Sequence, residues 1–538
     1  MASLAAAQEA LASGSWSQAD SAFRAVIAQT GDSVAHEGLA QVAWWTDDKD
    51  TCLTARETAY RLSRERGDAV GAARAATALA WDSLLFGCGR AVARGWLGLA
   101  RELLADVEER PEHGWYLVRE GEMALAADLD PLRAKEHAGR ATDVGRRTAD
   151  PDLTVVGLAL QGAALIRMGQ VRDGMDLLDP AAAAATAGDL TDLMWTGKVV
   201  CWLIAGCHET RDIARAQEWC ERVQKMCHDL DLLPLLHVCR IQYASVQVSA
   251  GVWLAAEKEL IETVGRLQGS LRASRLEAVV QLGELRRRQG RFREAERLFD
   301  QAEFDPVSIL GRALIWHAEG RSGSAWSSLQ RLLSMLPVEN RLARAEVLLP
   351  AARIAHALGR DDAAAAAAGE LRLTACAVRT EALMAMAAAA DAVLAPPPED
   401  TNLLHEAVRY YHRAGLRCDE VEARLLLAAG LADQADVRSA QDQLTAATDL
   451  LTDLEDPMGL AQARQLQDRL VGRSPELLTP REVEVLGLVS RGLTNEQVAD
   501  ALTLSQHTVH RHIANILTKL HQPSRAAAVS TAMSKGIL

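Results

Sequence analysis

Apolar and polar residues repeat along most of the chain with the period of an α-helix. Segments of helical length, rich in Ala, Leu, Arg and Glu, are separated by Gly, Asp and Pro, whereas alternating runs of β-branched residues are rare. Ala, Leu, Arg and Glu all favour helices over other conformations. The pattern therefore predicts an all-α protein.

The clearest unit is residues 276–306, in which two amphipathic segments meet at Gly290. Gly283 and Ala295 are small enough to let two helices approach closely, and residues 305–306, Asp-Pro, are expected to end the second helix. The apolar residues expected to face each other are Leu282, Phe292, Phe299 and Ala302. This spacing resembles the tetratricopeptide repeat, a helix-turn-helix unit of about 34 residues.

Weaker copies of the second half of this unit occur elsewhere, each with a glycine before small and apolar positions. They begin at Gly14, Gly169, Gly251 and Gly320. Because their spacing drifts above 34 residues, we expect about a dozen irregular hairpins that form a tetratricopeptide-like α-solenoid. Such a solenoid has a concave surface that binds a peptide, a protein or a small molecule. We therefore expect an effector there, and its class stays open.

Proline and glycine divide the chain into parts. A helical repeat domain is expected over residues 1–394, a Pro-rich loop over 395–401, further repeats over 402–470, a linker over 471–475 and a separate domain over 476–538.

Helix start signals are unusually complete in the C-terminal domain. Thr479-Pro480-Arg481-Glu482 and Thr494-Asn495-Glu496-Gln497 are both capping boxes, and Ser505 can cap a third helix. The predicted helices span about 479–491, 494–502 and 505–520, and a fourth begins at Pro523-Ser524 and is closed by Gly536.

The third of these helices has one apolar and one polar face. Its apolar positions are Val509, Ile513, Ile516, Leu517 and Leu520. Its polar face carries His507, His510, Arg511, Ala514 and Thr518. A short helix, a tight turn and a helix with a basic outer face predict a helix-turn-helix, whose second helix can enter the major groove of DNA.

The distribution of charged residues distinguishes the C-terminal end from the rest of the chain. The 538 residues include 58 Lys and Arg and 72 Asp and Glu, a net charge of -14, which argues against general coating of nucleic acid. No acidic residue follows Asp500, whereas four basic residues and four histidines do. A polyanion could therefore approach the C-terminal domain.

The segment LTPREVEVLGLVSRGLTNEQVADALTLSQHTVHRHIANILTKLHQPSRAAAV resembles the four-helix DNA-binding domain of LuxR-type transcription regulators. The resemblance implies base contacts from His510, Arg511 and Ala514. It implies contacts to the phosphate backbone of DNA from Thr508, His512, Lys519 and Ser524. It implies dimerisation through Ala526, Val529 and Met533. At His510 the family often has Lys or Arg, so the sequence departs from the family pattern there.

Other chemistry has little support in the sequence. The nine cysteines include no Cys-x-x-Cys pair, and the spacings among the five cysteines from Cys201 to Cys239 match no compact zinc site, so buried thiols are favoured over a metal or thiol sensor. Neither a phosphate-binding loop nor a dinucleotide fingerprint is present. We therefore expect no enzyme activity, no metal and no cofactor.

No apolar run is long enough to cross a bilayer, and the first residues lack the order of a secretory signal, which predicts a cytoplasmic protein without a membrane partner. The favoured function is a DNA-binding transcription regulator, dimeric on double-stranded DNA, in which a helical-repeat sensor controls the helix-turn-helix. The alternative is a tetratricopeptide-like interaction scaffold whose terminal domain mainly dimerises. A third hypothesis is a hydrolase with an unrecognised site.

Overall fold

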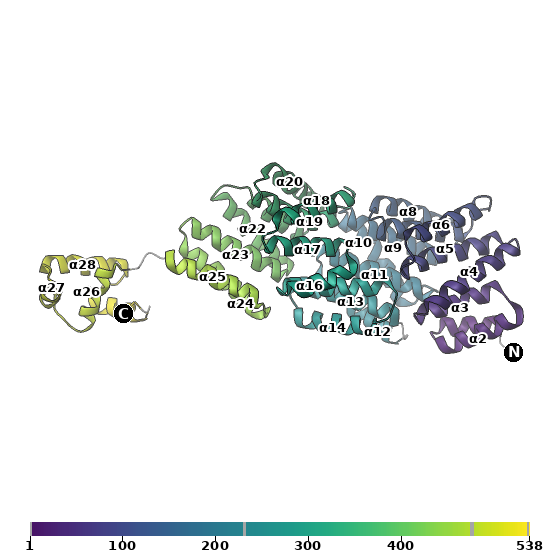
Figure 1. The fold of residues 1–538 in the computed structure, drawn as a ribbon, viewed down its shortest axis with the longest axis horizontal. Coiled ribbons are helices and arrows are strands. Elements are labelled where there is room, and N and C mark those ends of the chain that lie inside the picture. The colour runs from purple at the N-terminus through teal and green to yellow at the C-terminus, as the bar shows by residue number, and fades with distance from the viewer. Residues whose placement is uncertain (1–2, 230–232, 474–477, 535–536) are drawn as a thin grey trace.

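The computed structural model describes residues 3–229, 233–473, 478–534 and 537–538. Within these residues the chain forms helices and no strands, which confirms the all-α prediction. Helices α1 to α25 stack as antiparallel neighbours into a long array, and α26 to α29 form the C-terminal domain (Figure 1).

The first half of the array comprises α1 (Leu4–Ala12), α2 (Trp16–Thr30), α3 (Ser33–Trp45), α4 (Lys49–Glu65), α5 (Ala69–Leu85), α6 (Arg90–Leu104), α7 (Pro111–Ala126), α8 (Pro131–Arg147), α9 (Pro151–Arg167), α10 (Val171–Ala187), α11 (Leu193–Thr210) and α12 (Ile213–Asp229). The second half comprises α13 (Leu233–Ala250), α14 (Trp253–Arg266), α15 (Ala273–Arg288), α16 (Phe292–Phe299), the 3-10 helix η1 (Asp300–Ala302), α17 (Pro306–Ala318), α18 (Ser322–Met335), α19 (Arg341–Ala357), α20 (Asp361–Val378), α21 (Glu381–Ala392), α22 (Glu399–Ala414), α23 (Arg417–Asp433), α24 (Val437–Asp453) and α25 (Pro457–Arg473).

The hairpin recognised in the sequence is α15 and α16, which turn at Gly290 with a φ of +74°. Phe299 is fully buried, and a Cβ atom added to Gly283 would lie 2.7 Å from its ring. A Cβ atom on Gly311 of the next hairpin would lie 2.5 Å from the same ring. Phe299 therefore packs between two glycines, so one aromatic side chain joins three helices.

The weaker copies follow the same design. Gly14, Gly169, Gly251 and Gly320 all have positive φ, and a helix begins two residues after each. The repeat is irregular in length, because α17 begins 33 residues after α15 whereas α11 begins 42 residues after α9. The prediction of irregular tetratricopeptide-like hairpins is confirmed.

Two local expectations need correction. Asp305 and Pro306 do not end α16, which already stops at Phe299. They begin α17 instead, since the Asp305 carboxylate accepts the backbone N–H of Val307 at 2.9 Å and proline occupies the first turn. The Pro-rich segment 395–401 is only partly a loop, because α22 already begins at Glu399.

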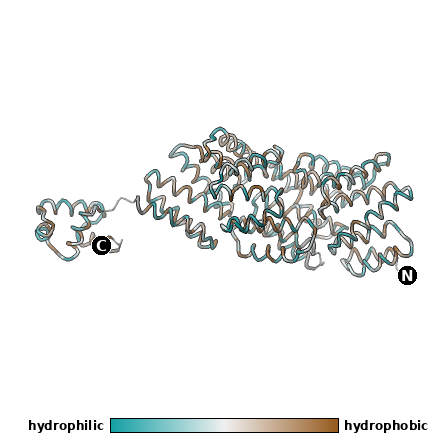
Figure 2. Tube along the Cα trace, viewed as in Figure 1, coloured by the Kyte–Doolittle hydropathy of each residue, from teal (hydrophilic) through white to brown (hydrophobic). Residues whose placement is uncertain are grey.

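The Pro-rich segment does not interrupt the core. Buried residues of α21 and α22, such as Ala389 and Leu404, belong to the same hydrophobic cluster. Figure 2 shows hydrophobic and hydrophilic segments alternating along the helices of the array. The proline tract is therefore a turn between two packed helices.

Segments far apart in the sequence also meet, because successive turns of the coiled array touch. A Cβ atom on Gly251 would lie 2.4 Å from Leu454, and one on Gly290 would lie 2.7 Å from Met458. The glycines at these hairpin turns thus serve twice, as positive-φ residues and as the places where a later helix can approach closely.

The C-terminal domain has its own hydrophobic core. The core of the array reaches Leu470, and the separate core of the domain starts at Leu478. Residues 471–473, expected in the linker, continue helix α25 to Arg473. The remaining linker residues, 474–475, lie outside the described residues.

Candidate DNA-binding interface and central cavity

The four helices of the C-terminal domain begin where the sequence indicates. They are α26 (Pro480–Ser490), α27 (Asn495–Leu502), α28 (Gln506–Lys519) and α29 (Arg525–Ser534). The hydroxyl of Thr479 accepts the N–H of Glu482, that of Thr494 accepts the N–H of Gln497, and that of Ser505 accepts the N–H of Thr508. These side-chain caps set the start of each of the first three helices, and with them the turn between α27 and α28.

Helix α28 presents two different faces. Val509, Ile516 and Leu520 are buried in the domain core, and Ile513 and Leu517 pack against it. The other face is exposed and carries His507, His510, Arg511, Ala514 and Thr518. Figure 1 shows α28 along one edge of the domain. The faces predicted from the sequence are confirmed.

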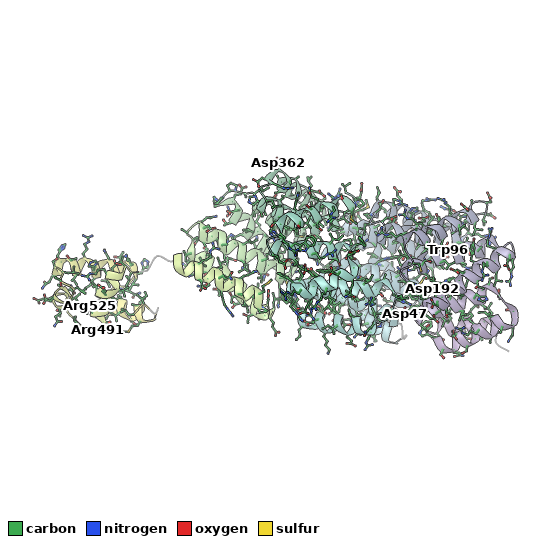
Figure 3. All side chains as sticks on the ribbon, in the orientation of Figure 1. Asp47, Trp96, Asp192, Asp362, Arg491 and Arg525 are labelled. Atoms are coloured by element: carbon green, nitrogen blue, oxygen red, sulfur yellow. The ribbon has the colours of Figure 1, made fainter. Side chains whose placement is uncertain are left out.

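Arg511 makes no hydrogen bond or ion pair with any residue that the structure describes. By contrast, Arg481 is held by Glu484 at 2.6 Å and by the Leu502 carbonyl at 2.8 Å, and Arg525 donates to the Leu493 carbonyl at 2.6 Å. Figure 3 shows Arg525 and Arg491 at the surface of the same domain. Arg511 is thus a cation whose donors remain available to a ligand.

The residues expected to meet the DNA backbone occupy different environments. Thr508 is half-buried, with its hydroxyl 2.7 Å from that of Ser505, and His512 is half-buried. Ser524 is exposed, and its hydroxyl accepts the N–H of Ala527 at 3.3 Å. Thr508 and Ser524 therefore already take part in capping helices α28 and α29.

Lys519 has a structural partner that the sequence did not reveal. Its Nζ donates to Oε2 of Glu482 at 2.6 Å, and the Glu482 side chain is only 4% exposed. Burial alone would raise the pKa of Glu482, but hydrogen bonds from Lys519 and from the N–H of Thr479 lower it below its ordinary value. Lys519 thus stabilises the capping box that starts α26.

We predict that Lys519→Met destabilises the C-terminal domain by about 1 to 3 kcal/mol at pH 7, because it leaves a buried carboxylate without its cation. Because the pKa of Glu482 is lowered in the folded protein, the ion pair stabilises the fold at pH values above the ordinary pKa of glutamate. This stabilisation is lost as the pH falls through the pKa that Glu482 has in the folded protein. Amide hydrogen exchange of α26 in both proteins measures the difference. Equal exchange at pH 7 would contradict the structural role and leave Lys519 as a phosphate contact only.

The three residues expected at the dimer interface lie on α29. Ala526 and Met533 are exposed, with Met533 at 58%, and Val529 is half-buried. Positions 526, 529 and 533 share one side of a helix. This single chain therefore leaves an apolar strip of α29 uncovered.

Residues 476–532 match the model of a known family, bacterial regulatory proteins of the luxR family. The C-terminal domain is a LuxR-type helix-turn-helix. Transcriptional regulatory protein ComA of Bacillus subtilis is 41% identical over 66 residues, which are 12% of this chain and 31% of ComA. Response regulator protein VraR of Staphylococcus aureus is 38% identical over 63 residues, 12% of this chain and 30% of VraR. The chain thus spans about a third of the length of these relatives.

Solved structures resemble the helical array only loosely. The APC/C hetero-tetramer Cut9-Hcn1 covers 87% of this chain and 92% of its own, with 13% identity and a TM-score of 0.43. A Rap protein complexed with competence and sporulation factor covers 71% and 98%, with 11% identity and a TM-score of 0.36. The solenoid character of the array is therefore established by its own helix packing.

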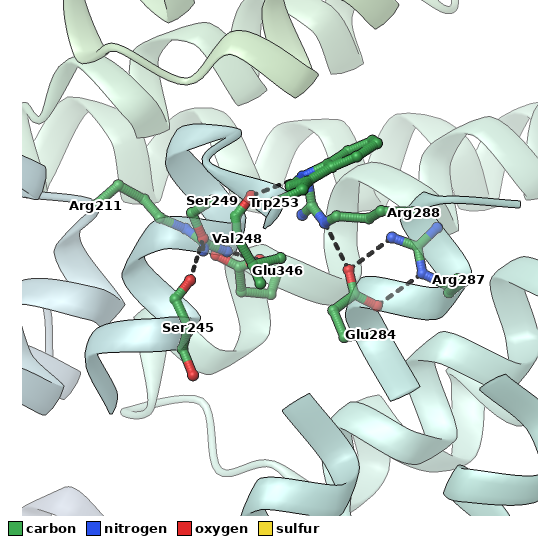
Figure 4. Close-up of polar contacts among 9 residues, drawn as sticks. All are labelled: Arg211, Ser245, Val248, Ser249, Trp253, Glu284, Arg287, Arg288 and Glu346. Carbon is green, nitrogen blue, oxygen red and sulfur yellow. Dashed lines mark hydrogen bonds and ion pairs between the residues drawn. The ribbon is translucent and has the colours of Figure 1, made fainter. Parts of the chain in front are cut away.

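The array forms a cavity of about 1830 Å³, called here the central cavity, which is lined by residues of helices from α7 to α25. Its polar centre is shown in Figure 4. Both Arg287 and Arg288 donate to Glu284, at 2.7 Å and 2.8 Å, and Arg211 pairs with Glu346 at 2.8 Å. Glu284, Arg287 and Arg288 all lie on α15, whereas the Arg211–Glu346 pair joins two separate hairpins across the cavity wall.

Two ionisable groups that line the central cavity have strongly shifted pKa values. Burial would raise the pKa of Glu284, but Arg287 and Arg288 lower it to about 2. Burial lowers the pKa of His208 to about 3, with Arg211 and Arg288 acting in the same direction, so this ring is neutral at pH 7. The sequence carried no signal for this centre, because Arg211 and Glu346 are 135 residues apart.

The cysteines considered as a sensor lie mostly in the core. Cys207, Cys220 and Cys239 are buried, and Cys201 lies with its Sγ atom 4.0 Å from that of Cys239. Among the described residues no group of three or more His, Cys, Asp or Glu side chains is placed to hold a metal ion. None of the described helices has both the length and the apolar character of a membrane span.

Proposed function

We propose that this protein is a transcription regulator in which α28 reads the major groove of DNA and a ligand in the central cavity controls that binding. The observation that supports this most is the exposed, unpaired Arg511 on the outer face of the second helix of a LuxR-type helix-turn-helix. This exposed face of α28 does not contribute to the packing of its own domain, and in a helix-turn-helix it is the face that enters the major groove.

The proposed base contacts come from His510, Arg511 and Ala514, which share this face. The Arg511 guanidinium can donate two parallel hydrogen bonds to O6 and N7 of guanine, whereas Ala514 can only touch a thymine methyl group. Thr508, His512 and Ser524 surround the face and would meet phosphates. Lys519 already donates one hydrogen bond to Glu482, and the other donors of its ammonium group would meet a phosphate.

Dimerisation is proposed through a strip of α29 formed by the exposed Ala526 and Met533 and the half-buried Val529. Two copies paired there would each offer one α28 to a half-site, with centres about 34 Å apart along the DNA. Ligand binding in the array would change how readily the two domains reach these positions. This coupling would connect ligand binding in the array to DNA binding by the C-terminal domains.

Selection of bound fragments from a random pool of double-stranded DNA tests the proposal with the full chain. We expect enrichment of one sequence with two half-sites, and an affinity that falls linearly with the logarithm of salt concentration. Failure to enrich any sequence, with a dimer that forms equally well without DNA, would contradict the proposal and favour the interaction scaffold.

A further inference from the structure

The central cavity is larger than a site for a small molecule. Pockets for such ligands usually measure about 300 to 1,000 Å³, whereas this one measures about 1830 Å³. Much of its lining is apolar, including Val280, Leu310, Leu349 and Leu425. An occupant that fills it is therefore longer than a metabolite and carries apolar side chains.

The arginines that line the cavity are already paired with carboxylates. Arg167 pairs with Glu209 at 2.9 Å, Arg211 with Glu346 at 2.8 Å, and Arg353 with Glu422. Arg287 and Arg288 share Glu284. An anionic occupant would have to displace one of these carboxylates, so the walls do not favour a negative charge.

Glu277 is different, because it lines the cavity without a cation among the described residues. Its carboxylate accepts a hydrogen bond from the side-chain amide of Gln242. Lys198, the cation that acts on it, is itself paired with Glu122 at 2.7 Å. Glu277 lies seven residues before Glu284, about two turns along the same face of α15. Glu277 is therefore a carboxylate of the cavity wall that forms no ion pair with a described cation.

Asn340 is a second, independent observation that points to a ligand in this cavity. It lines the cavity and is only 1% exposed. Its amide group donates to the Leu129 carbonyl at 2.9 Å, but its Oδ1 atom has no hydrogen-bond partner among the described residues. A buried acceptor left empty costs free energy, and an N–H donor from an occupant would satisfy it.

We propose that the central cavity binds an extended basic peptide, whose lysine or arginine side chain pairs with Glu277 and whose backbone N–H groups donate to acceptors such as Asn340. The size of the cavity, its apolar walls and the Glu277 carboxylate, which has no cation partner, together favour this occupant. The regulatory meaning of the peptide rests on the proposed function, but its binding does not.

The pH dependence of binding follows from the surroundings of Glu277. Burial raises its pKa to about 7, the carboxylate of Asp305 adds to this rise, and Lys198 opposes it. The group is therefore ionised above pH 7 and increasingly neutral below it. A basic peptide should bind more tightly at pH 8 than at pH 6, since lysine and arginine stay charged over this range.

The test uses the immobilised full chain and a synthetic pool of acetylated, amidated octapeptides of random sequence. We expect lysine or arginine to be enriched among retained peptides, and at least a tenfold loss of affinity for an enriched peptide in Glu277→Gln. The matched control is Glu57→Gln, which makes the same chemical change at an exposed position of α4 and should bind as the unaltered protein does. Circular dichroism of both variants checks that they fold.

Three results would overturn the proposal: enrichment of acidic peptides, unchanged affinity in Glu277→Gln, or no retained peptide. Binding of spermidine without any peptide would also overturn it in favour of a small polyamine. DNA binding by the same preparations is measured separately. Loss of DNA binding with intact peptide binding would contradict only the proposed function. Loss of peptide binding with intact DNA binding would contradict only the peptide proposal.

Discussion

Arg511→Ala is expected to weaken binding to the selected DNA site far more than binding to a scrambled duplex. A bidentate contact to guanine contributes about 1 to 3 kcal/mol of discrimination, so the loss is about 5- to 150-fold for each half-site. Binding to the scrambled duplex should fall only by the loss of one positive charge. Titration of both duplexes at one salt concentration gives the ratio.

Arg491→Ala is the matched control for this experiment. Arg491 is also exposed, but it follows α26 and is not on α28. Its loss removes the same charge from the same domain, so any effect should be equal for the two duplexes. Equal losses for Arg511→Ala would instead mean that Arg511 only attracts phosphates.

Phe299→Ala should destabilise the middle of the array by about 3 to 5 kcal/mol, the usual cost of removing a fully buried phenylalanine. Its ring fills the space between Gly283 and Gly311. Because glycine has no side chain, neither residue can fill the cavity that the substitution leaves. Because a long array does not unfold in one step, hydrogen exchange of α15 and α17 measures the effect locally.

Phe304→Ala makes the same chemical change five residues later, where the side chain is 80% exposed. Exposed substitutions usually change stability by less than about 0.5 kcal/mol. Similar exchange rates in the two variants would contradict the packing described for Phe299. A large effect confined to α15–α17 in Phe299→Ala alone would support it.

Local rules were enough to predict the C-terminal domain from its sequence. Thr479, Thr494 and Ser505 cap helices that begin at the next residue, and the apolar period of α28 gives its buried face. These signals depend on residues three or four positions apart. The same holds for the array hairpins, where a positive-φ glycine such as Gly290 precedes the second helix.

Contacts between distant segments could not be predicted. Nothing near Lys519 indicates that it holds Glu482, and nothing near Gly290 indicates that Met458 approaches it. Both contacts depend on how complete helices pack. Asp305-Pro306 was misread for a related reason, since the pair signals a helix start as well as a stop and only the position of α16 decides between them.

The most direct test of DNA reading by α28 replaces each guanine of the selected site in turn with 7-deazaguanine, which lacks the N7 acceptor. Dissociation constants are measured for the unaltered protein and for Arg511→Ala. We predict one guanine in each half-site whose replacement weakens the unaltered protein but has no further effect on Arg511→Ala. Additive losses at every guanine would contradict a contact between Arg511 and the major groove.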